Sequence, residues 1–388
     1  MKNTLHFILR VLLLAISLLL AIGLLLACLA QVVPPDKFHC AAFCGVLFAP
    51  LFWGNVLCAV LWIFSSKRIY GLLPLIFILI SLPALFKTYS HGTPLTTEGK
   101  CSPTDSNPES VKQLSVLTYN THQCQMARKT PYNEVLRYVR ESGADIVFLQ
   151  EYEVRKNNNQ LTFSDARQYL EDTYHYTYFD FALYNNFRQY GIAVFSRYPL
   201  INKRTIRYES AANISDCCDV IVGSDTIRLF NNHLESNRLT ADDIGGVTDE
   251  KLSSEGVRRS FVNLTEKMRK AYKYRAHEVK TVSAEIAASP YPVIVAGDMN
   301  DVPVSYTYNT IKHARKNMQD CFLLGSAGRK GHTYLFGSSP WNNIFGVRID
   351  YLFVSDCFKV ADCRTDNVPY SDHLPLRTEL LLIRTEEN

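Results

Sequence analysis

The stretch VIVAGDMND at residues 293–301 decides the fold. Its first four residues are apolar, and the first three are β-branched. This composition predicts a strand buried on both faces. Gly297 lets the backbone turn where a side chain would obstruct it. Asp298 and Asn300 are two residues apart, so in an extended segment their side chains point to the same side. The stretch therefore predicts a buried strand that delivers two polar groups to the rim of a sheet.

Five further segments place an acid, an amide or a histidine in a similar setting. They are LTYN, which ends at Asn120, DIVFLQE, which ends at Glu151, NNHLES around His233, RIDYLFVS with Asp350, and SDHLP with Asp372 and His373. Several of them join an apolar run to a polar residue at or just past its end. Each segment alone is a weak signal, but together they predict a single active site.

Hydrophobic residues are concentrated at the start of this chain of 388 residues. Three apolar runs occupy about residues 5–33, 40–64 and 69–85. Each approaches or exceeds the roughly 20 residues that cross a bilayer as a helix. A cleaved signal peptide is the alternative for the first run, but that run is long and two more spans follow it. We therefore expect three transmembrane helices.

The charged residues beside these runs predict an orientation. Lys2, Arg10, Lys67 and Arg68 lie on one side, whereas Lys37 and Lys87 lie on the other. The bias favours a cytoplasmic N terminus, and three spans then place the rest of the chain across the membrane. We expect a multi-pass protein of the cell inner membrane with an extracytoplasmic, periplasmic catalytic domain. The formal net charge of +4 is mild and does not by itself require a nucleic-acid partner.

The remainder of the chain predicts one α/β domain. We expect a membrane anchor at residues 1–90, a polar linker rich in Pro, Ser, Thr and Gly at 91–112, and a catalytic domain at 113–388. Strand patterns occupy 114–119, 146–149, 192–195, 226–230, 293–296 and 350–354, and helix patterns occupy 133–142, 164–173 and 254–288. The long helix carries a core-facing apolar stripe and basic residues on its other faces. Those basic residues are either solvated or contact anionic lipid headgroups or a polyanionic substrate.

The sequence motifs GDMND, RIDYLFV and SDHLP are the most specific signals in the chain. Over about residues 111–383 the sequence resembles the endonuclease/exonuclease/phosphatase superfamily, the metal-dependent phosphoesterases related to DNase I. The resemblance implies a four-layer α/β/β/α sandwich, here preceded by the three transmembrane helices. It places the active site at one edge of the packed sheets.

The resemblance implies that Mg²⁺ or Mn²⁺ is the cofactor. Hard oxygen ligands suit these ions and leave coordination positions for phosphate and water. Glu151 is the leading candidate ligand, Asn120 is an amide ligand or an orienting group beside it, and Asp372 matches a family residue near the metal.

The resemblance also implies catalytic roles for five residues. Asp298 orients or deprotonates water, and Asn300 donates to a phosphate oxygen. Asp350 orients His373, which contacts the scissile phosphate, and His233 is a candidate general acid for the leaving group.

These observations predict a membrane-anchored, divalent-metal-dependent phosphoesterase that acts by in-line attack of water. The substrate class stays open between lipid, nucleotide and nucleic acid, and no obligate protein partner is evident. An extracytoplasmic DNase-like endonuclease is one alternative, and a catalytically inactive, membrane-tethered binding module is another. The sequence contains no GxSxG elbow, no GxxxxGK[ST] phosphate loop and no HExxH zinc site.

Overall fold

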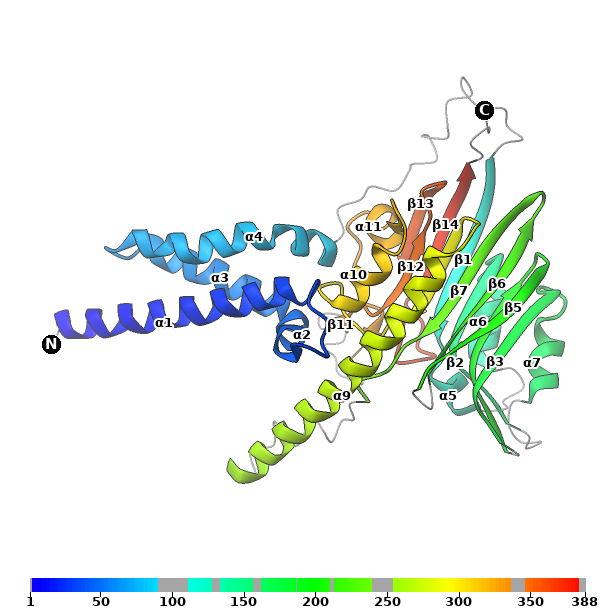
Figure 1. The fold of residues 1–388 in the computed structure, drawn as a ribbon, viewed down its shortest axis with the longest axis horizontal. Helices are drawn as coiled ribbons and strands as arrows, with labels where there is room; N and C mark the ends of the chain where they lie inside the picture. Colours follow the sequence, from blue (N-terminus) through cyan, green and yellow to red (C-terminus); the bar gives the residue numbers. More distant parts are fainter. Residues whose placement is uncertain are drawn as a thin grey trace, which may run out of the picture. The chain divides into compact units, whose positions relative to one another are not determined.

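The computed structural model describes residues 2–89, 111–127, 133–155, 162–185, 187–209, 213–238, 254–335 and 346–383. Nearly all of the predicted linker lies outside these residues. The chain divides into two compact units (Figure 1). One unit comprises Met1–Tyr89 with Asp301–Asn309, and the other comprises Ser90–Asn300 with Thr310–Asn388.

The first unit is helical. It contains α1 (Lys2–Leu29), α2 (His39–Val46), α3 (Phe48–Ile63), the 3₁₀ helix η1 (Arg68–Gly71) and α4 (Leu72–Thr88). Two helices, Thr4–Leu29 and Arg68–Thr88, are long and apolar enough to cross a membrane. The pair α2 and α3 would make a third span, although the two helices meet at an angle of 72°.

The bend in the predicted middle span has a cause in the sequence. Pro50 is the third residue of α3, a position in the first helical turn where its missing N–H costs nothing. A helix continuing from α2 through Pro50 would lose a hydrogen bond and clash with the preceding turn. Polar contacts join the helices: the indole N–H of Trp62 donates to Ser17 Oγ at 3.0 Å, and Asn55 donates to the Leu20 carbonyl at 3.0 Å.

The second unit contains two sheets of six strands. In the first sheet the order is β13 (Phe358–Thr365), β14 (Leu376–Ile383), β1 (Val111–Asn120), β2 (Ile146–Arg155), β4 (Arg188–Ser196), β3 (Tyr176–Tyr184). In the second sheet the order is β5 (Leu200–Arg207), β6 (Ile214–Val222), β7 (Asp225–His233), β8 (Val293–Asp298), β12 (Asp350–Val354), β9 (Gln319–Asp320). A small ladder joins β10 (Tyr334–Leu335) to β11 (Gly346–Val347).

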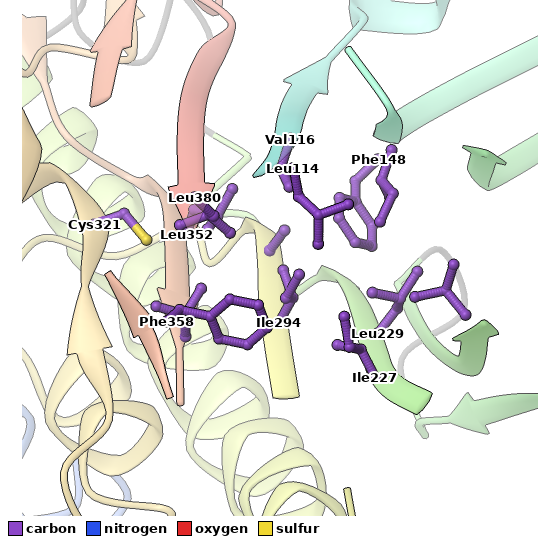
Figure 2. Packing of buried hydrophobic residues seen from close by; sticks show 14 of the residues in the cluster. Leu114, Val116, Phe148, Ile227, Leu229, Ile294, Cys321, Leu352, Phe358 and Leu380 are labelled. Atoms are coloured by element: carbon purple, nitrogen blue, oxygen red, sulfur yellow. The ribbon is translucent and has the colours of Figure 1, made fainter. Parts of the chain in front are cut away.

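The two sheets pack face to face through apolar side chains. Figure 2 shows Leu114, Val116 and Phe148 of the first sheet packing against Ile227, Leu229 and Ile294 of the second. Because successive side chains of a strand point to opposite faces, the neighbours of the first set point outward instead. This alternation produces two hydrophobic layers from the same strands.

Helices cover both outer faces. Val135, Leu136 and Val139 of α6 (Glu134–Glu141) and Ala166 and Leu170 of α7 (Phe163–Leu170) pack on the first sheet. The C-terminal half of α9 (Ser254–Ala287) covers the second sheet, and its Glu285 pairs with Arg204 of β5 at 2.6 Å. Three short helices complete the described structure: α5 (His122–Ala127), α10 (Tyr306–Lys312) and α11 (Cys321–Gly325). The result is an α/β/β/α sandwich, which confirms the predicted fold class.

Candidate active site

Strand direction brings the predicted residues to one edge of the sandwich. β1 runs parallel to β2, and β7 runs parallel to β8, so each pair ends at a common edge. Asn120, His233 and Asp298 are the last residues of β1, β7 and β8. β12 runs antiparallel to β8, and its first residue, Asp350, lies directly opposite Asp298. The segment before β14 returns beside the end of β1, which places His373 at the same edge.

Gly297 is required for the approach of β8 to β7. Its φ angle is +131°, a conformation that side-chain-bearing residues rarely adopt, and a Cβ there would lie 2.0 Å from the carbonyl oxygen of Asn232. The glycine therefore allows the backbone of Asp298 to pair closely with that of His233. Gly297 lies within β8, so the turn predicted at this glycine is wrong, and the residue instead permits the close approach of two strands.

The centre of the site is a histidine between two aspartates. Nδ1 of His373 is 2.9 Å from Asp350 Oδ2, and Nε2 is 3.8 Å from Asp298 Oδ2. The first distance is a hydrogen bond, whereas the second is too long for one. All three side chains are buried. The second oxygen of Asp350, Oδ1, has no hydrogen-bond partner among the described residues.

The two carboxylates determine the charge of the imidazole. Burial alone would lower the pKa of His373, but the neighbouring Asp350 and Asp298 outweigh it and raise this pKa to about 10. Burial, together with the nearby Asp350, raises the pKa of Asp298 above its ordinary value. The site thus combines a stable imidazolium with a carboxylate that is more basic than usual.

Two asparagines hold the Asp298 carboxylate. Asn120 Nδ2 donates to Asp298 Oδ2 at 2.9 Å, and Asn300 donates its backbone N–H to Oδ1 at 2.8 Å and its amide N–H to Oδ2 at 3.2 Å. Asn300 has a φ angle of +52°, which is uncommon for a residue with a side chain. This backbone strain is what folds the Asn300 amide back over Asp298.

Glu151 lies at an irregularity in β2 rather than at the end of the strand. The pairing of β2 with β4 shifts register between Leu149 and Tyr152, and Glu151 has a φ angle of +50°. The strand then continues to Arg155, so the predicted strand end at Leu149 is wrong. A bulge displaces the carboxylate towards the site, which is what bulges commonly do beside active sites. Asn120 Nδ2 lies 3.5 Å from its Oε1.

His233 is buried without a hydrogen-bond partner. Its side chain is 3 % exposed, and neither ring nitrogen is bonded within the described residues. Nε2 lies 3.7 Å from Glu151 Oε1. A buried polar group left unpaired costs free energy, so an unbonded imidazole at a sheet edge marks a position that a ligand can satisfy.

Asp372 joins the network at its exposed side. Ser371 Oγ lies 2.8 Å from the carbonyl oxygen of Asn120 and 3.3 Å from Asp372 Oδ1, and His122 Nδ1 lies 3.3 Å from the same carboxylate oxygen. The Asp372 side chain is 36 % exposed. The structure therefore connects all eight predicted residues, with Asp372 linked through Ser371.

The charge balance of the site fits a divalent cation. Glu151, Asp298, Asp350 and Asp372 supply four carboxylates, and within the described part of the chain none of them forms an ion pair with a lysine or arginine. Ligand atoms of Asp298, Asp350 and His373 lie within 4.8 Å of one another, but a metal among them would compete with the hydrogen bond between Asp350 and His373. Glu151 and Asp372 are more accessible oxygen donors.

Five supporting residues were not predicted from the sequence. Thr333 Oγ1 accepts from the backbone N–H of Asp350 at 3.0 Å, and Ser371 Oγ accepts from that of His373 at 3.1 Å. The Tyr334 ring lies 5.0 Å from the His373 ring in an edge-on arrangement. Arg275 donates to the carbonyl of Asn300. The fifth is His122, beside Asp372. Of these, Ser371 stands inside a predicted motif and His122 follows Asn120 by two residues, but the other three are distant from every motif in the sequence.

Two family models match the chain. The model of the endonuclease/exonuclease/phosphatase family matches residues 117–373, and a model described as a domain of unknown function, DUF8431, matches residues 10–88. No curated protein matches the chain in sequence.

Similar solved structures share the fold at low identity. An endonuclease/exonuclease/phosphatase from Beutenbergia cavernae DSM 12333 is 19% identical, with 70% of this chain and 72% of that chain covered and a TM-score of 0.48. D. rerio TDP2 complexed with single strand DNA product is 15% identical, with 69% and 99% covered and a TM-score of 0.46. The human Nocturnin catalytic domain with bound sulfate anion is 16% identical, with 69% and 94% covered and a TM-score of 0.46.

Proposed function

Because the chain belongs to the endonuclease/exonuclease/phosphatase family, whose members are generally hydrolases of phosphate esters, we propose that it is a membrane-anchored phosphoesterase that depends on Mg²⁺ or Mn²⁺. The observation that carries the proposal is the buried imidazolium of His373, held between Asp350 and Asp298. A cation fixed in this way at a sheet edge suits recognition of a phosphate.

Glu151 and Asp372 are the residues that would hold the metal. Asn120 supports Glu151 as an orienting group, since its amide nitrogen, rather than its oxygen, faces the carboxylates of Glu151 and Asp298. When bound, a divalent cation neutralises phosphate charge and polarises the ester. The excess of carboxylates over cations among the described site residues supports this assignment.

Asp298 acts on the attacking water. Its raised pKa makes its carboxylate a stronger base than an ordinary aspartate, and Asn120 and Asn300 fix its two oxygens. A water within hydrogen-bond reach gives its proton to Asp298 as its oxygen attacks phosphorus. The pairing of Asp298 with Asp350 across β8 and β12 keeps the base at the rim of the sandwich.

His373 stabilises the negative charge that develops on the phosphate. Its Nε2 hydrogen is directed towards Asp298 but is too far away to be satisfied by it, so a phosphate oxygen can accept that hydrogen bond. Asp350 keeps the ring oriented through Nδ1. The Asn300 amide donates to Asp298 Oδ2 and to the carbonyl oxygen of Leu234, so its proposed bond to a phosphate oxygen would replace one of these.

His233 serves the leaving group. Its unbonded ring nitrogens and burial suit a general acid that gives a proton to the departing ester oxygen as the phosphorus–oxygen bond breaks. Glu151 Oε1 lies 3.7 Å from Nε2 and can orient the ring. The leaving oxygen departs in line with and opposite the attacking water.

The helices of Met1–Tyr89 anchor the protein in the membrane. The two apolar helices, and the bent pair as a third span, support a multi-pass protein. The distribution of Lys and Arg favours an orientation with the catalytic domain outside the cytoplasm, and we propose that this is the periplasmic side of a bacterial inner membrane. The substrate is a phosphate ester of a lipid, a nucleotide or a nucleic acid.

Hydrolysis by the full-length chain in lipid nanodiscs tests the proposal. Wild type is compared with His373→Ala on plasmid DNA, sphingomyelin, a phosphoinositide and a generic phosphodiester, with Mg²⁺ or Mn²⁺ and with chelator. We expect metal-dependent cleavage that His373→Ala abolishes and that the exposed control His277→Ala retains. The preferred substrate distinguishes a nuclease from a lipid phosphoesterase. A folded protein that binds neither metal nor phosphate ester and cleaves nothing is instead a tethered binding module.

A further inference from the structure

One apolar stripe runs the whole length of α9. Its members recur at intervals of three or four residues and therefore share one face of the helix. They are Val257, Phe261, Leu264, Met268, Tyr272, Ala276, Val279, Val282 and Ile286.

The C-terminal half of this stripe is covered by the catalytic unit. Tyr272, Val279, Val282 and Ile286 are fully buried. Polar contacts also secure this half, because Glu278 accepts from the backbone N–H of Glu235 at 2.7 Å. The apolar face here has the ordinary function of closing an outer layer of the sandwich.

The N-terminal half of the same stripe is incompletely covered: Phe261 is exposed, and its other members are only partly buried. No residue from 255 to 270 is buried, and Phe261 and Val262 are 55 % and 54 % exposed. Figure 1 shows this half of α9 extending beyond the strands of the sheets it flanks. Because the apolar stripe extends beyond the sheet that the helix covers, its N-terminal part presents an apolar surface that requires another partner.

This exposed half is also basic. Residues 254–270 contain five basic side chains (Arg258, Arg259, Lys267, Arg269 and Lys270) and two acidic ones, a net charge of +3. The whole chain carries only +4. An apolar stripe flanked by basic residues is the pattern of helices that lie in the interface of an anionic bilayer.

We infer that the N-terminal half of α9 lies along the surface of a bilayer that contains anionic lipid, with Phe261 inserted among the acyl chains and the basic residues on the headgroups. The inference rests on the proposed membrane anchoring, which supplies the bilayer. A nucleic acid would engage the basic residues but would leave the aliphatic stripe uncovered, so lipid accounts for both features.

The buried C-terminal half of α9 contacts the active site through Arg275. Arg275 lies two helical turns after Met268, donates to the carbonyl of Asn300 and to Asn237 Oδ1, the latter at 2.5 Å, and belongs to the buried half. Because the helix is unbroken between these positions, seating its first half on lipid holds the Asn300 segment near the bilayer surface. The site would then face substrates presented at that surface.

Photocrosslinking in vesicles tests the docking. The full chain is reconstituted in vesicles of phosphatidylglycerol and phosphatidylcholine, with p-benzoylphenylalanine in place of Phe261. The matched control carries the same residue in place of Tyr274, which is 44 % exposed and lies on the opposite face of α9. Flotation of the vesicles reports anchoring separately from docking.

We expect lipid adducts at position 261 in several-fold excess over position 274. Equal lipid labelling at both positions would overturn the docking, as would adducts at 261 only to peptide, whether of the same chain or of a second copy. Added single-stranded DNA that replaces lipid as the crosslinked species would do the same. A chain that does not float with the vesicles contradicts the anchoring, whereas a floating chain without lipid adducts at 261 contradicts the docking alone.

A charge variant supplies the second arm. Arg258→Glu, Lys267→Glu and Arg269→Glu together should reduce the yield of lipid adducts at position 261 at least about fivefold, because these three residues flank the apolar stripe and each basic residue near an anionic surface contributes about that factor to partitioning. Vesicles of phosphatidylcholine alone should give the same loss with the basic residues intact. An unchanged yield in both cases would show that charge has no part in the contact.

Discussion

Two buried groups of charged side chains lie in the catalytic unit, and they differ in how completely they are paired. Arg348 and Asp320 form an ion pair at 2.7 Å, with 4 % and 1 % of their side chains exposed. Asp320 also caps α11 by accepting from the backbone N–H of Phe322 at 3.0 Å. Asp298, Asp350 and His373 are as deeply buried, yet Asp350 Oδ1 has no partner among the described residues, and Asp298 is separated from His373 by 3.8 Å.

The difference distinguishes a charge pair that stabilises the fold from a group of charges that serves function. Burying a charge is costly unless it is paired, so a carboxylate with partners for both oxygens, as in Asp320, stabilises the fold, and one with an unpaired oxygen, as in Asp350, is maintained for another purpose. At the sheet edge that purpose is to accept a substrate and a metal. If this interpretation is correct, mutations in the two groups have opposite consequences: one should reduce activity, and the other should reduce stability.

The largest effect is expected at Asp298. Replacing it with Asn keeps the shape and one acceptor oxygen but removes the base, so turnover should fall about 10²–10⁴-fold. The thermal midpoint should stay the same or rise, since the change removes a buried carboxylate whose pKa is raised. Steady-state kinetics and thermal unfolding of Asp298→Asn, beside exposed His277→Ala, measure both. Normal turnover would remove Asp298 from the mechanism.

The opposite result is expected at Arg348. Arg348→Met leaves the Asp320 carboxylate buried without its cation, which should lower the free energy of unfolding by about 3–5 kcal/mol. Activity per folded molecule should remain close to wild type. Denaturant unfolding compares this variant with Arg269→Met, which breaks a half-exposed pair with Glu266 and should cost less than about 1 kcal/mol. Equal costs in the two variants would contradict the structural role of the buried pair.

The pH dependence of stability sharpens the contrast. In the folded protein Asp350 and Asp298 raise the pKa of His373 to about 10, above the ordinary value of 6.5. A raised imidazole pKa contributes stability that is fully present below pH 6.5 and is lost as the pH rises towards 10. In the chelated protein the free energy of unfolding should therefore fall with pH over this window, by up to about 1.4 kcal/mol per pH unit. His373→Gln should remove that slope, and an unchanged slope would assign it elsewhere.

The site was more predictable from the sequence than the strands were. Asn120, Glu151, His233, Asp298 and Asp350 all lie in or at the end of buried strands whose apolar runs are visible in the sequence. Strand direction then brings them together, which local patterns cannot specify. The pairing of β1 with β14 in particular joins residues that are 258 to 272 positions apart along the chain, from Thr118 with Leu376 to Val111 with Ile383.

Other elements are harder to predict from the sequence. β5 is exposed at most positions, as Asn202, Lys203 and Arg204 illustrate, so no apolar run marks it. β6 carries Asp216 and Asp219 in its interior, and such residues normally argue against a buried strand. The middle transmembrane span was predicted as one helix although Pro50 interrupts it. In each case the deciding interaction comes from a neighbouring element or a single backbone constraint.

The smallest effect is expected at Asp216 in β6. This residue tests whether incomplete pairing of a buried carboxylate indicates function. Its side chain is fully buried, both carboxylate oxygens lack partners among the described residues, and burial raises its pKa well above the ordinary value. Asp219, three residues later on the same strand, is equally buried but pairs with Arg228 at 2.7 Å. The two aspartates lie on opposite faces of the same strand, outside the active site, and are equally buried but differently paired.

Replacing each with Asn should move stability in opposite directions. A carboxyl group whose folded pKa is raised loses stability as the pH rises from its unfolded pKa through its folded pKa, so Asp216→Asn should match wild type near pH 4 and exceed it increasingly towards neutral pH, by about 1–3 kcal/mol. Asp219→Asn should be destabilising at neutral pH, because Arg228 loses its anion. Chemical unfolding of both variants at several pH values decides the matter. If Asp216→Asn is also destabilising at neutral pH, an unpaired buried carboxylate in this protein is not a sign of function. The incomplete pairing around His373 would then no longer indicate a site for substrate and metal.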